Sequence, residues 1–271
     1  MKHLFREWDR IKIDLENKFL AIFLDYDGTL TPIAQTPDRA ILAQDIRVLL
    51  KKLAKMPDCK LAIISGRALA GIERLVDIKE IEYVGNHGLE IGGSAINFES
   101  LLTPRFKEII GQIKNNLNVQ LAAIEGILVE DKGLTLSIHY RLMDEQHMPR
   151  LKKILNKVIK PYLPGKEVRA GFGKKVFEIR PPVQWDKGKA ILWLLKNAQY
   201  GFKKTGALPI YLGDDFTDED AFEAIKNKGL TVRVGSAKSS HARYYLKDTE
   251  EVGQFLMRIL ALKGSSSICR G

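Results

Sequence analysis

Short apolar runs that end in polar residues are the most regular pattern in this chain of 271 residues. The first run covers residues 19–24 and leads directly into Asp25. An unbroken apolar run of this length is typical of a strand buried on both faces of a parallel sheet. Four more strands are predicted from runs at residues 60–64, 81–84, 209–213 and 230–234.

Segments with apolar residues at helical spacing separate these runs. They predict helices over residues 1–17, 40–55, 69–75, 187–199, 217–226 and 250–263. Thr217, with Asp220 three residues later, is expected to cap the fifth of these helices. A loose tail is expected from Gly264 to Gly271. The alternation of strands and helices predicts a doubly wound sheet.

The pattern changes between residues 103 and 181. Two helices, each followed by a strand pair with a turn signal, are predicted there over residues 104–117, 127–129 with 134–140, 144–159, and 167–170 with 175–179. We therefore predict an α/β fold with a doubly wound, Rossmann-like parallel sheet as its core. The core domain would comprise residues 1–102 and 182–271, and an inserted α+β cap domain would comprise residues 103–181.

Composition narrows the class of protein. No apolar run approaches the ~20 residues of a membrane span. The formal net charge of +10 suggests a nucleic-acid partner, but the basic residues are scattered and accompany no DNA-binding motif. We expect neither a membrane nor a nucleic-acid partner. Cys59 and Cys269 show no metal-ligand spacing, and the first residues lack a secretory signal, so a cytoplasmic location is expected.

Two of the predicted strands end in closely spaced carboxylates. Asp25 and Asp27 follow the first apolar run, and Asp214 and Asp215 follow the run at 209–213. Open α/β sheets bind ligands at the carboxyl ends of their strands. Mg²⁺ is commonly held by one or two carboxylates together with a substrate phosphate. Two acidic strand ends in one sheet therefore predict a shared Mg²⁺ site.

Each acidic group also has a plainer explanation. Asp27 and Gly28 fit an ordinary turn at the end of a strand. Asp218, Glu219 and Asp220 fit the acidic first turn of a helix. The strand-end positions of the two pairs, rather than either pair alone, favour the metal site.

Two further positions fit a phosphate-binding site. Ser65 follows the run at 60–64, where a hydroxyl together with helix amides can cradle a phosphate, although an ordinary helix N-cap is the alternative. Lys187 begins a predicted helix. The helix dipole disfavours a cation at that end, which supports charge neutralisation at a phosphate over a plain surface lysine.

The order of these motifs resembles the haloacid dehalogenase superfamily of phosphatases: Asp-x-Asp-Gly-Thr, Ser-Gly-Arg, Lys-Gly and Gly-Asp-Asp-x-Thr-Asp. The finer pattern is similar to the trehalose-6-phosphate phosphatase family over roughly residues 19–260. The matching stretches lie in both predicted domains, at residues 24–33, 64–67, 85–90, 130–133, 139–141, 177–181, 187–190 and 211–215.

The resemblance implies a phosphatase that forms an aspartyl-phosphate. Asp25 would attack phosphorus. Asp27 would protonate the leaving sugar oxygen and then deprotonate the hydrolytic water. Ser65 and Lys187 would hold the phosphoryl oxygens. Positioning and charge stabilisation account for most of the catalysis of phosphoryl transfer, which agrees with these roles.

The resemblance also implies Mg²⁺ as the cofactor. Its ligands would be the Asp25 carboxylate, the Asp27 backbone carbonyl and Asp214. Asp215 or Asp218 would support the site. Mg²⁺ would contribute both positioning and charge stabilisation.

Recognition of the sugar would fall mainly to the cap, and a site built to bond hydroxyls rejects analogues that lack them. The predicted substrate-binding residues are Arg67, Asn86, His87, Lys132, Arg169, Lys175 and Glu178. Taken singly, each of those in the cap also fits a hairpin surface charge. The expected partner is a small-molecule sugar phosphate, with a functional link to a trehalose-6-phosphate synthase, and we expect a monomer.

Two other functions stay open at this point. Another sugar phosphatase or a phosphomutase of the same superfamily would share the core motifs, and only the cap motifs argue against it. A catalytically silent regulatory domain should have lost one of the four motifs. Asp25, Asp27, Lys187 and Asp214 are all present, which argues against a silent domain.

Overall fold

The computed structural model describes residues 1–92, 104–197 and 201–268. Its contacts divide the chain into a main unit, Met1–Gly93 with Trp185–Gly271, and an inserted unit, Ser94–Gln184. Each unit is described by itself. The inserted unit begins before residue 103 and ends after residue 181, the limits predicted for the cap. The roles of the two units as catalytic core and cap stay predictions.

The main unit is built on one largely parallel sheet with the strand order β1-β12-β11-β10-β2-β3-β4-β5. Among the described strands of this sheet, only β5 pairs antiparallel, against β4. The strands are β1 (Lys2–His3), β2 (Leu20–Leu24), β3 (Cys59–Ile64), β4 (Glu82–Gly85), β5 (Glu90–Ile91), β10 (Leu208–Gly213), β11 (Leu230–Val234) and β12 (Tyr244–Leu246). The five predicted strands are therefore present, with β1, β5 and β12 in addition.

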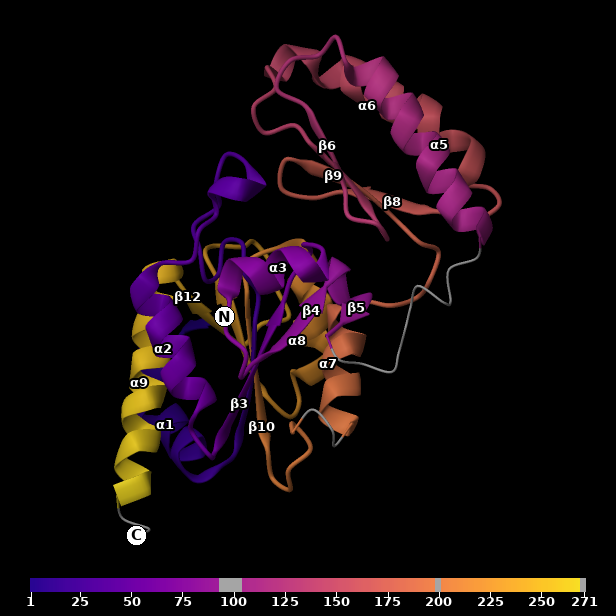
Figure 1. Ribbon diagram of the computed structural model, residues 1–271. Coiled ribbons are helices and arrows are strands. Elements are labelled where there is room, and N and C mark those ends of the chain that lie inside the picture. Colours follow the sequence, from indigo (N-terminus) through magenta and orange to yellow (C-terminus); the bar gives the residue numbers. More distant parts are fainter. Residues whose placement is uncertain (93–103, 198–200, 269–271) are drawn as a thin grey trace. The chain divides into compact units, whose positions relative to one another are not determined.

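Helices cover both faces of this sheet (Figure 1). Alternate residues of β2 point to opposite faces, so Ile22 packs in one hydrophobic cluster and Phe23 in the other. The first cluster takes residues from α1 (Trp8–Asn17), α2 (Gln44–Ala54), α3 (Leu69–Val76) and α9 (Thr249–Ile268). The second takes residues from α7 (Lys187–Lys196) and α8 (Glu219–Ile225). Because both faces of β2 are buried, its sequence lacks the alternation of a half-exposed strand.

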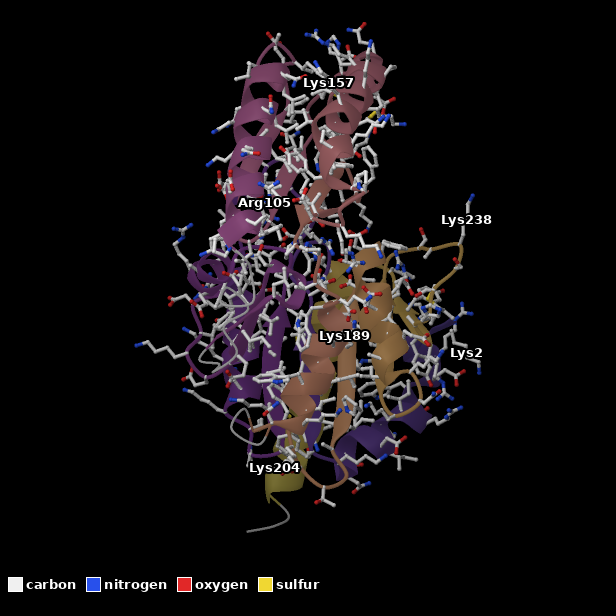
Figure 2. All side chains as sticks on the ribbon, turned by 90° about the vertical axis from the view of Figure 1, so that its right-hand side faces the viewer. Lys2, Arg105, Lys157, Lys189, Lys204 and Lys238 are labelled. Carbon is white, nitrogen blue, oxygen red and sulfur yellow. The ribbon has the colours of Figure 1, made fainter. Side chains whose placement is uncertain are left out.

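The inserted unit has an antiparallel sheet of order β6-β7-β9-β8, formed by Leu128–Asp131, Leu136–His139, Val176–Arg180 and Arg169–Phe172. Helices α5 (Pro104–Leu121) and α6 (Met148–Ile159) lie side by side in this unit (Figure 1). This is the predicted α+β arrangement of two helices and two hairpins. Basic side chains are spread over both units (Figure 2), for example Lys2, Arg105, Lys157, Lys189, Lys204 and Lys238.

Some local predictions are wrong. The segment predicted as one helix over residues 1–17 begins with β1 and a 3₁₀ turn, Leu4–Glu7, before α1. The main chain of α9 continues to Ile268, so Gly264 lies within a helix; the last three residues of the predicted tail lie outside the described part of the chain. None of the described helices is long and apolar enough to span a membrane.

The predicted cap at Thr217 is also wrong. A 3₁₀ turn, Phe216–Asp218, precedes α8, and the capping box is formed by Asp215 and Asp218. In that box the backbone N–H of Asp215 donates to Oδ2 of Asp218 at 2.8 Å. The box therefore starts two residues earlier than predicted. It links Asp215 to Asp218 within the loop after β10.

Candidate active site

Two adjacent strands place the acidic residues at one edge of the main sheet. Leu24 at the end of β2 pairs in parallel with Leu212 of β10. The backbone N–H of Asp25 donates to the carbonyl of Leu212 at 2.9 Å, which continues the pairing by one step. Asp25 and Asp214 therefore leave the sheet at the same edge, as expected for the carboxyl ends of parallel strands.

Three carboxylates meet at this edge. One oxygen from each of Asp25, Asp214 and Asp218 lies within 4.8 Å of the others, and all three side chains are buried. Gly28 lies against this cluster: a Cβ at Gly28 would lie 2.2 Å from Oδ2 of Asp214. A side chain at Gly28 would therefore collide with the carboxylate of Asp214.

Lys187 supplies positive charge within the cluster. Its Nζ lies 2.7 Å from Oδ1 of Asp25 and 2.6 Å from Oδ1 of Asp218, and its side chain is only 3% exposed. It is the first residue of α7, whose N-cap Asp186 accepts a hydrogen bond from the backbone of Lys189 at 2.8 Å. The helix dipole disfavours a cation at the start of α7, and the two carboxylates of Asp25 and Asp218 compensate for it.

Burial and these charges set the protonation of the cluster. Burial raises the pKa of Asp25 well above its ordinary value, with Lys187 opposing and Asp218 and Asp214 adding to the rise. Burial alone would also raise the pKa of Asp218, but the charge and hydrogen bond of Lys187, together with hydrogen bonds from Tyr211 and Asp215, lower it. Burial would lower the pKa of Lys187, but Asp218 and Asp25 raise it, so Lys187 stays a cation.

Asp218 is the most constrained member of the cluster. The Tyr211 hydroxyl donates to its Oδ1 at 2.6 Å, and the backbone N–H of Asp215 donates to its Oδ2. Burial, and then the charge of Asp218, raises the pKa of Tyr211 well above its ordinary value, which keeps the hydroxyl a donor. Asp218 therefore belongs to the carboxylate cluster directly, while the side chain of Asp215 takes part in the capping box.

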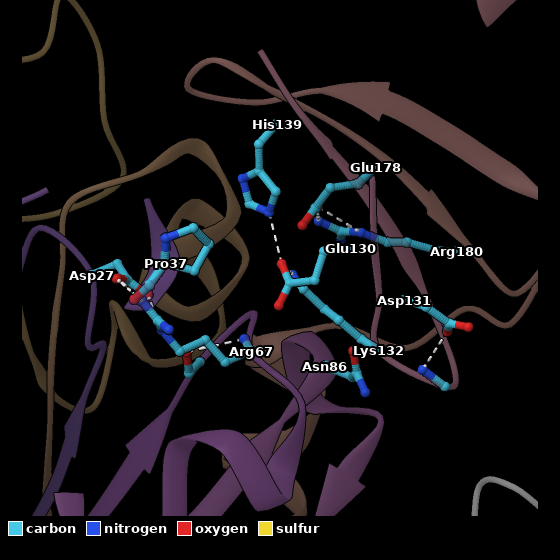
Figure 3. A network of polar contacts seen from close by, with 12 residues as sticks. Asp27, Pro37, Arg67, Asn86, Glu130, Asp131, Lys132, His139, Glu178 and Arg180 are labelled. Atoms are coloured by element: carbon cyan, nitrogen blue, oxygen red, sulfur yellow. Dashed lines mark hydrogen bonds and ion pairs between the residues drawn. The ribbon is translucent and has the colours of Figure 1, made fainter. Parts of the chain in front are cut away.

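Asp27 is held apart from the cluster by a guanidinium group. Arg67 donates from Nε to Oδ2 of Asp27 and from Nη2 to Oδ1, each at 2.7 Å (Figure 3). Nη2 also donates to the carbonyl of Pro37 at 2.9 Å, and the guanidinium lies 5.4 Å from the centre of the Tyr26 ring. The two aspartates of the first motif therefore have different environments, one against an ammonium group and the other against a guanidinium.

Ser65 is buried directly after β3, the strand beside β2. Its Oγ accepts from the backbone N–H of Arg67 at 3.2 Å. The alternative that Ser65 is an ordinary helix N-cap is wrong, because α3 begins at Leu69, as predicted, and its N-cap is Ala68. Ser65 therefore caps a turn within its own motif, and its predicted role at phosphate stays a prediction.

Asn86 and His87 lie in a 3₁₀ turn after β4 and are both buried. Asn86 donates from Nδ2 to Oε2 of Glu90 at 2.6 Å. A Cβ at Gly66 would lie 2.4 Å from the His87 ring, so the motif that contains Ser65 packs directly on this turn. Whether these two residues bind substrate stays a prediction.

The donor set at the sheet edge fits Mg²⁺. Hard divalent cations take oxygen ligands, and the buried carboxylates of Asp25, Asp214 and Asp218 offer them within a few ångströms. Burying like charges together is costly unless a cation compensates, and Lys187 is one charge against three. Asp218, expected as a supporting residue, contributes a carboxylate oxygen within the cluster, and the Asp27 carbonyl as a ligand stays a prediction.

One face of the sheet in the inserted unit is polar. Pairing puts Glu130 opposite Ser137 and Ser137 opposite Glu178, so the three share a face. His139, two residues from Ser137, lies on the same face, and its Nε2 is 2.7 Å from Oε2 of Glu130 (Figure 3). Arg180 pairs with Glu178, with Nε at 3.1 Å from Oε2. This row of acidic and basic side chains is suited to hydroxyl groups.

The predicted sugar-binding residues of this unit differ in their surroundings. Lys132 is nearly buried, with Nζ 3.8 Å from Oε2 of Glu130, and Glu178 is held by Arg180. Lys175 is exposed and pairs with Glu145 at 2.9 Å. Arg169 is exposed and donates to the carbonyl of Val183 at 3.2 Å. Lys132 thus pairs with Glu130, and Glu178 pairs with Arg180, whereas Lys175 and Arg169 have other partners.

Sequence reasoning missed several polar contributors: Glu130, Arg180, Tyr211 and Arg233. The first two had a signal, since Glu130 lies two residues from Lys132, and Arg180 two from Glu178, on strands that alternate. Tyr211 and Arg233 lie in apolar strand runs, so only their contacts in the folded structure identify them. Arg233 donates from Nη2 to the backbone carbonyl of Asp214 at 2.8 Å.

Known proteins are similar to this sequence over most of its length. The trehalose-phosphatase family model matches residues 23–250. A probable trehalose-phosphate phosphatase 4 of Oryza sativa subsp. japonica is 35% identical over 268 residues, covering 96% of this chain and 71% of the relative. This chain belongs to the trehalose-phosphatase family. As a family member it is a phosphoric monoester hydrolase, as the motifs predict.

Solved structures confirm the fold class of this family member. The C-terminal domain of a C. albicans trehalose-6-phosphate phosphatase has a TM-score of 0.84 at 24% identity, covering 96% of this chain and 99% of that one. A haloacid dehalogenase-like hydrolase from Bacteroides thetaiotaomicron has a TM-score of 0.61 at 18% identity, covering 89% and 100%. The two structures share the fold of this chain. The predicted haloacid dehalogenase-like α/β fold is therefore confirmed.

Proposed function

We propose that this trehalose-phosphatase family member hydrolyses trehalose 6-phosphate to trehalose and phosphate through an aspartyl-phosphate on Asp25. One observation supports the chemistry above all: Lys187, buried, bridges Asp25 and Asp218 at the sheet edge that also carries Asp214. A nucleophile, a fixed cation and further metal-ligating carboxylates are the parts that phosphoryl transfer requires.

The first step joins Asp25 to the phosphoryl group. Lys187 fixes one carboxylate oxygen of Asp25, which orients the other toward phosphorus. A bond forms between that oxygen and phosphorus as the bond from phosphorus to the sugar oxygen breaks. Asp27, protonated on one oxygen in place of one of its two contacts with Arg67, gives that proton to the leaving sugar oxygen.

The second step reverses the proton transfer. Asp27 takes a proton from water, the water oxygen bonds to phosphorus, and the bond to Asp25 breaks, which releases phosphate. The Ser65 hydroxyl and Lys187 bind phosphoryl oxygens in both steps. Asp25, Asp214 and Asp218 would hold Mg²⁺, with the Asp27 carbonyl as a further ligand; when bound, the ion neutralises charge on the phosphoryl oxygens.

Selection of the sugar falls to the inserted unit in this proposal. Its polar sheet face offers carboxylates paired with basic side chains, with Glu130, His139, Glu178 and Arg180 as members. Such groups bond sugar hydroxyls well and are left unpaired by an analogue without them. A functional link to a trehalose-6-phosphate synthase, a monomeric state and a cytoplasmic location remain part of the proposal, and light scattering of the purified chain tests the second.

The direct test is phosphate release from a panel of esters. Trehalose 6-phosphate, glucose 6-phosphate, sucrose 6-phosphate and p-nitrophenyl phosphate are compared with Mg²⁺ and with chelator. We expect strong preference for trehalose 6-phosphate, lost with chelator and in Asp25→Asn. Equal turnover of glucose 6-phosphate would refute the substrate assignment, and activity that survives Asp25→Asn would refute the mechanism.

A variant in the inserted unit separates sugar recognition from chemistry. Glu178→Gln should raise KM for trehalose 6-phosphate and leave the turnover of p-nitrophenyl phosphate, which carries no sugar, unchanged. A parallel loss on both substrates would place Glu178 in the chemistry or the folding of the protein, not in sugar recognition.

A further inference from the structure

Arg233 contacts the acidic loop at a place that none of the proposed catalytic steps uses. It lies on β11, where it pairs in register with Gly213, the last residue of β10. Its side chain is 9% exposed, so a full charge sits inside the main unit. A buried guanidinium is costly to desolvate and is normally retained only where its hydrogen bonds are strong.

The two terminal nitrogens of Arg233 bind different parts of the loop after β10. Nη2 donates to the backbone carbonyl of Asp214 at 2.8 Å, and Nη1 donates to Oε1 of Glu219 at 2.7 Å. The other oxygen of Glu219 accepts from the backbone N–H of His241 at 2.7 Å. Arg233 therefore ties the residue after the strand to the first turn of α8 and, through Glu219, to the segment that precedes β12.

This clamp acts on one member of the carboxylate cluster through its backbone. Asp218 is fixed from its own side chain by Lys187 and Tyr211. The backbone of Asp214 is held by Arg233, and its carboxylate occupies the space that a Cβ at Gly28 would take. Fixing the main chain of Asp214 limits the directions in which its carboxylate can point. A metal site requires its ligand atoms to be placed within about half an ångström.

We propose that Arg233 is a positioning residue that presents Asp214 to the divalent cation. The inference rests on the metal site of the proposed function. Arg233 touches neither the substrate nor the ion in this proposal; its guanidinium holds the Asp214 carbonyl and Glu219 at once. A planar fork with two separated donors suits two acceptors, whereas the single ammonium group of lysine serves them less well.

Direct metal binding tests the proposal without any substrate. Mn²⁺ serves as the probe, and its affinity is measured by electron paramagnetic resonance and by calorimetry. Arg233→Met should weaken Mn²⁺ binding at least tenfold, and Arg233→Lys should fall between Arg233→Met and the wild type. Arg243→Met is the matched control, because Arg243 is exposed directly before β12 and stacks on Tyr244; its Mn²⁺ affinity should equal that of the wild type.

A purely structural role gives a different result. In that case Arg233→Met would lower the melting temperature in chelator and leave Mn²⁺ affinity of the folded protein unchanged, which overturns the proposal. If Arg233→Met does not fold, Glu219→Gln decides instead: it frees one arm of the clamp and should weaken Mn²⁺ binding severalfold, while wild-type affinity overturns the proposal.

The result is independent of the substrate. If the wild type releases no phosphate from trehalose 6-phosphate but its Mn²⁺ affinity depends on Arg233, the proposed function fails and the role of Arg233 stands. If the wild type is active and Arg233→Met binds Mn²⁺ normally, only the role of Arg233 fails.

Discussion

Arg67 holds both carboxylate oxygens of Asp27, with Nε and Nη2 each at 2.7 Å. A two-bond contact between guanidinium and carboxylate fixes direction as well as distance. The sequence suggested Arg67 as a substrate ligand, whereas this contact points to control of the proposed general acid. The two roles predict different kinetics.

If Arg67 positions Asp27, Arg67→Met should lower kcat by about tenfold to a hundredfold with little change in KM, because a misdirected acid loses part of the ~10²–10⁴-fold gain of general acid catalysis. Arg67→Lys should recover little, since lysine cannot make the paired contact. Steady-state kinetics on trehalose 6-phosphate measure both constants. A rise in KM with unchanged kcat would instead support substrate binding by Arg67.

Removal of Lys187 should destabilise the fold. Lys187→Met leaves Asp25 and Asp218 buried without their shared cation, and breaking a buried pair in this way costs about 3–5 kcal/mol. Urea unfolding in chelator measures the change. Lys189→Met is the control on the same helix: its side chain is 45% exposed, so the change should stay within about 0.5 kcal/mol. Equal losses in both variants would contradict the role assigned to the buried pair.

Gly28 should not tolerate a side chain. In Gly28→Ala the new Cβ would lie 2.2 Å from Oδ2 of Asp214. The φ of +84° at Gly28 adds backbone strain of about 1–2 kcal/mol. We expect loss of phosphatase activity and of Mn²⁺ binding.

Gly206→Ala separates strain from contact. Gly206 has a similar φ of +70°, but, its chain neighbours aside, no atom of the described residues lies within 4 Å of its Cβ position. It should lose about the same 1–2 kcal/mol in unfolding free energy and keep full activity. If Gly206→Ala loses activity to the same degree as Gly28→Ala, backbone strain rather than the contact with Asp214 explains the effect.

Cys59 should make stability depend on alkaline pH. Burial raises the pKa of its thiol to about 11, whereas an unfolded thiol titrates near 8.5. The folded chain then binds more protons than the unfolded chain between these values, so this contribution is complete below about pH 8.5 and is lost as pH rises toward about 11. The measurement is the free energy of urea unfolding against pH.

Two comparisons isolate the effect of Cys59. Cys59→Val should flatten the alkaline fall in stability, because it removes the titrating group and keeps a side chain of similar size. In a Cys269→Ser background, the wild-type Cys59 should react with a thiol reagent at pH 8 only on unfolding. Rapid labelling of the folded chain would contradict a buried, protonated thiol.

The main elements of the fold follow from local patterns that need no distant partner. The strand β2 and the aspartates after it were predicted because a doubly buried strand shows an unbroken apolar run. The capping box was misplaced by two residues, since Thr217 and Asp220 have suitable types but the chain makes a 3₁₀ turn first, which lets Asp215 and Asp218 form the box. Asp218 is also bound by Lys187, a contact that local sequence does not reveal.

The sequence by itself determined the type of chemistry: paired aspartates at strand ends, a lysine at a helix start and a family pattern that spans both units. Tertiary structure decided which carboxylates act together. It brought Asp218 into contact with Lys187, 31 positions away in the sequence. Asp27 is bound by Arg67 and not by Lys187. Charge pairing of this kind depends on distance and burial, and neither is encoded in spacing along the chain, so only the folded sheet edge separates the residues that share a cation from those that do not.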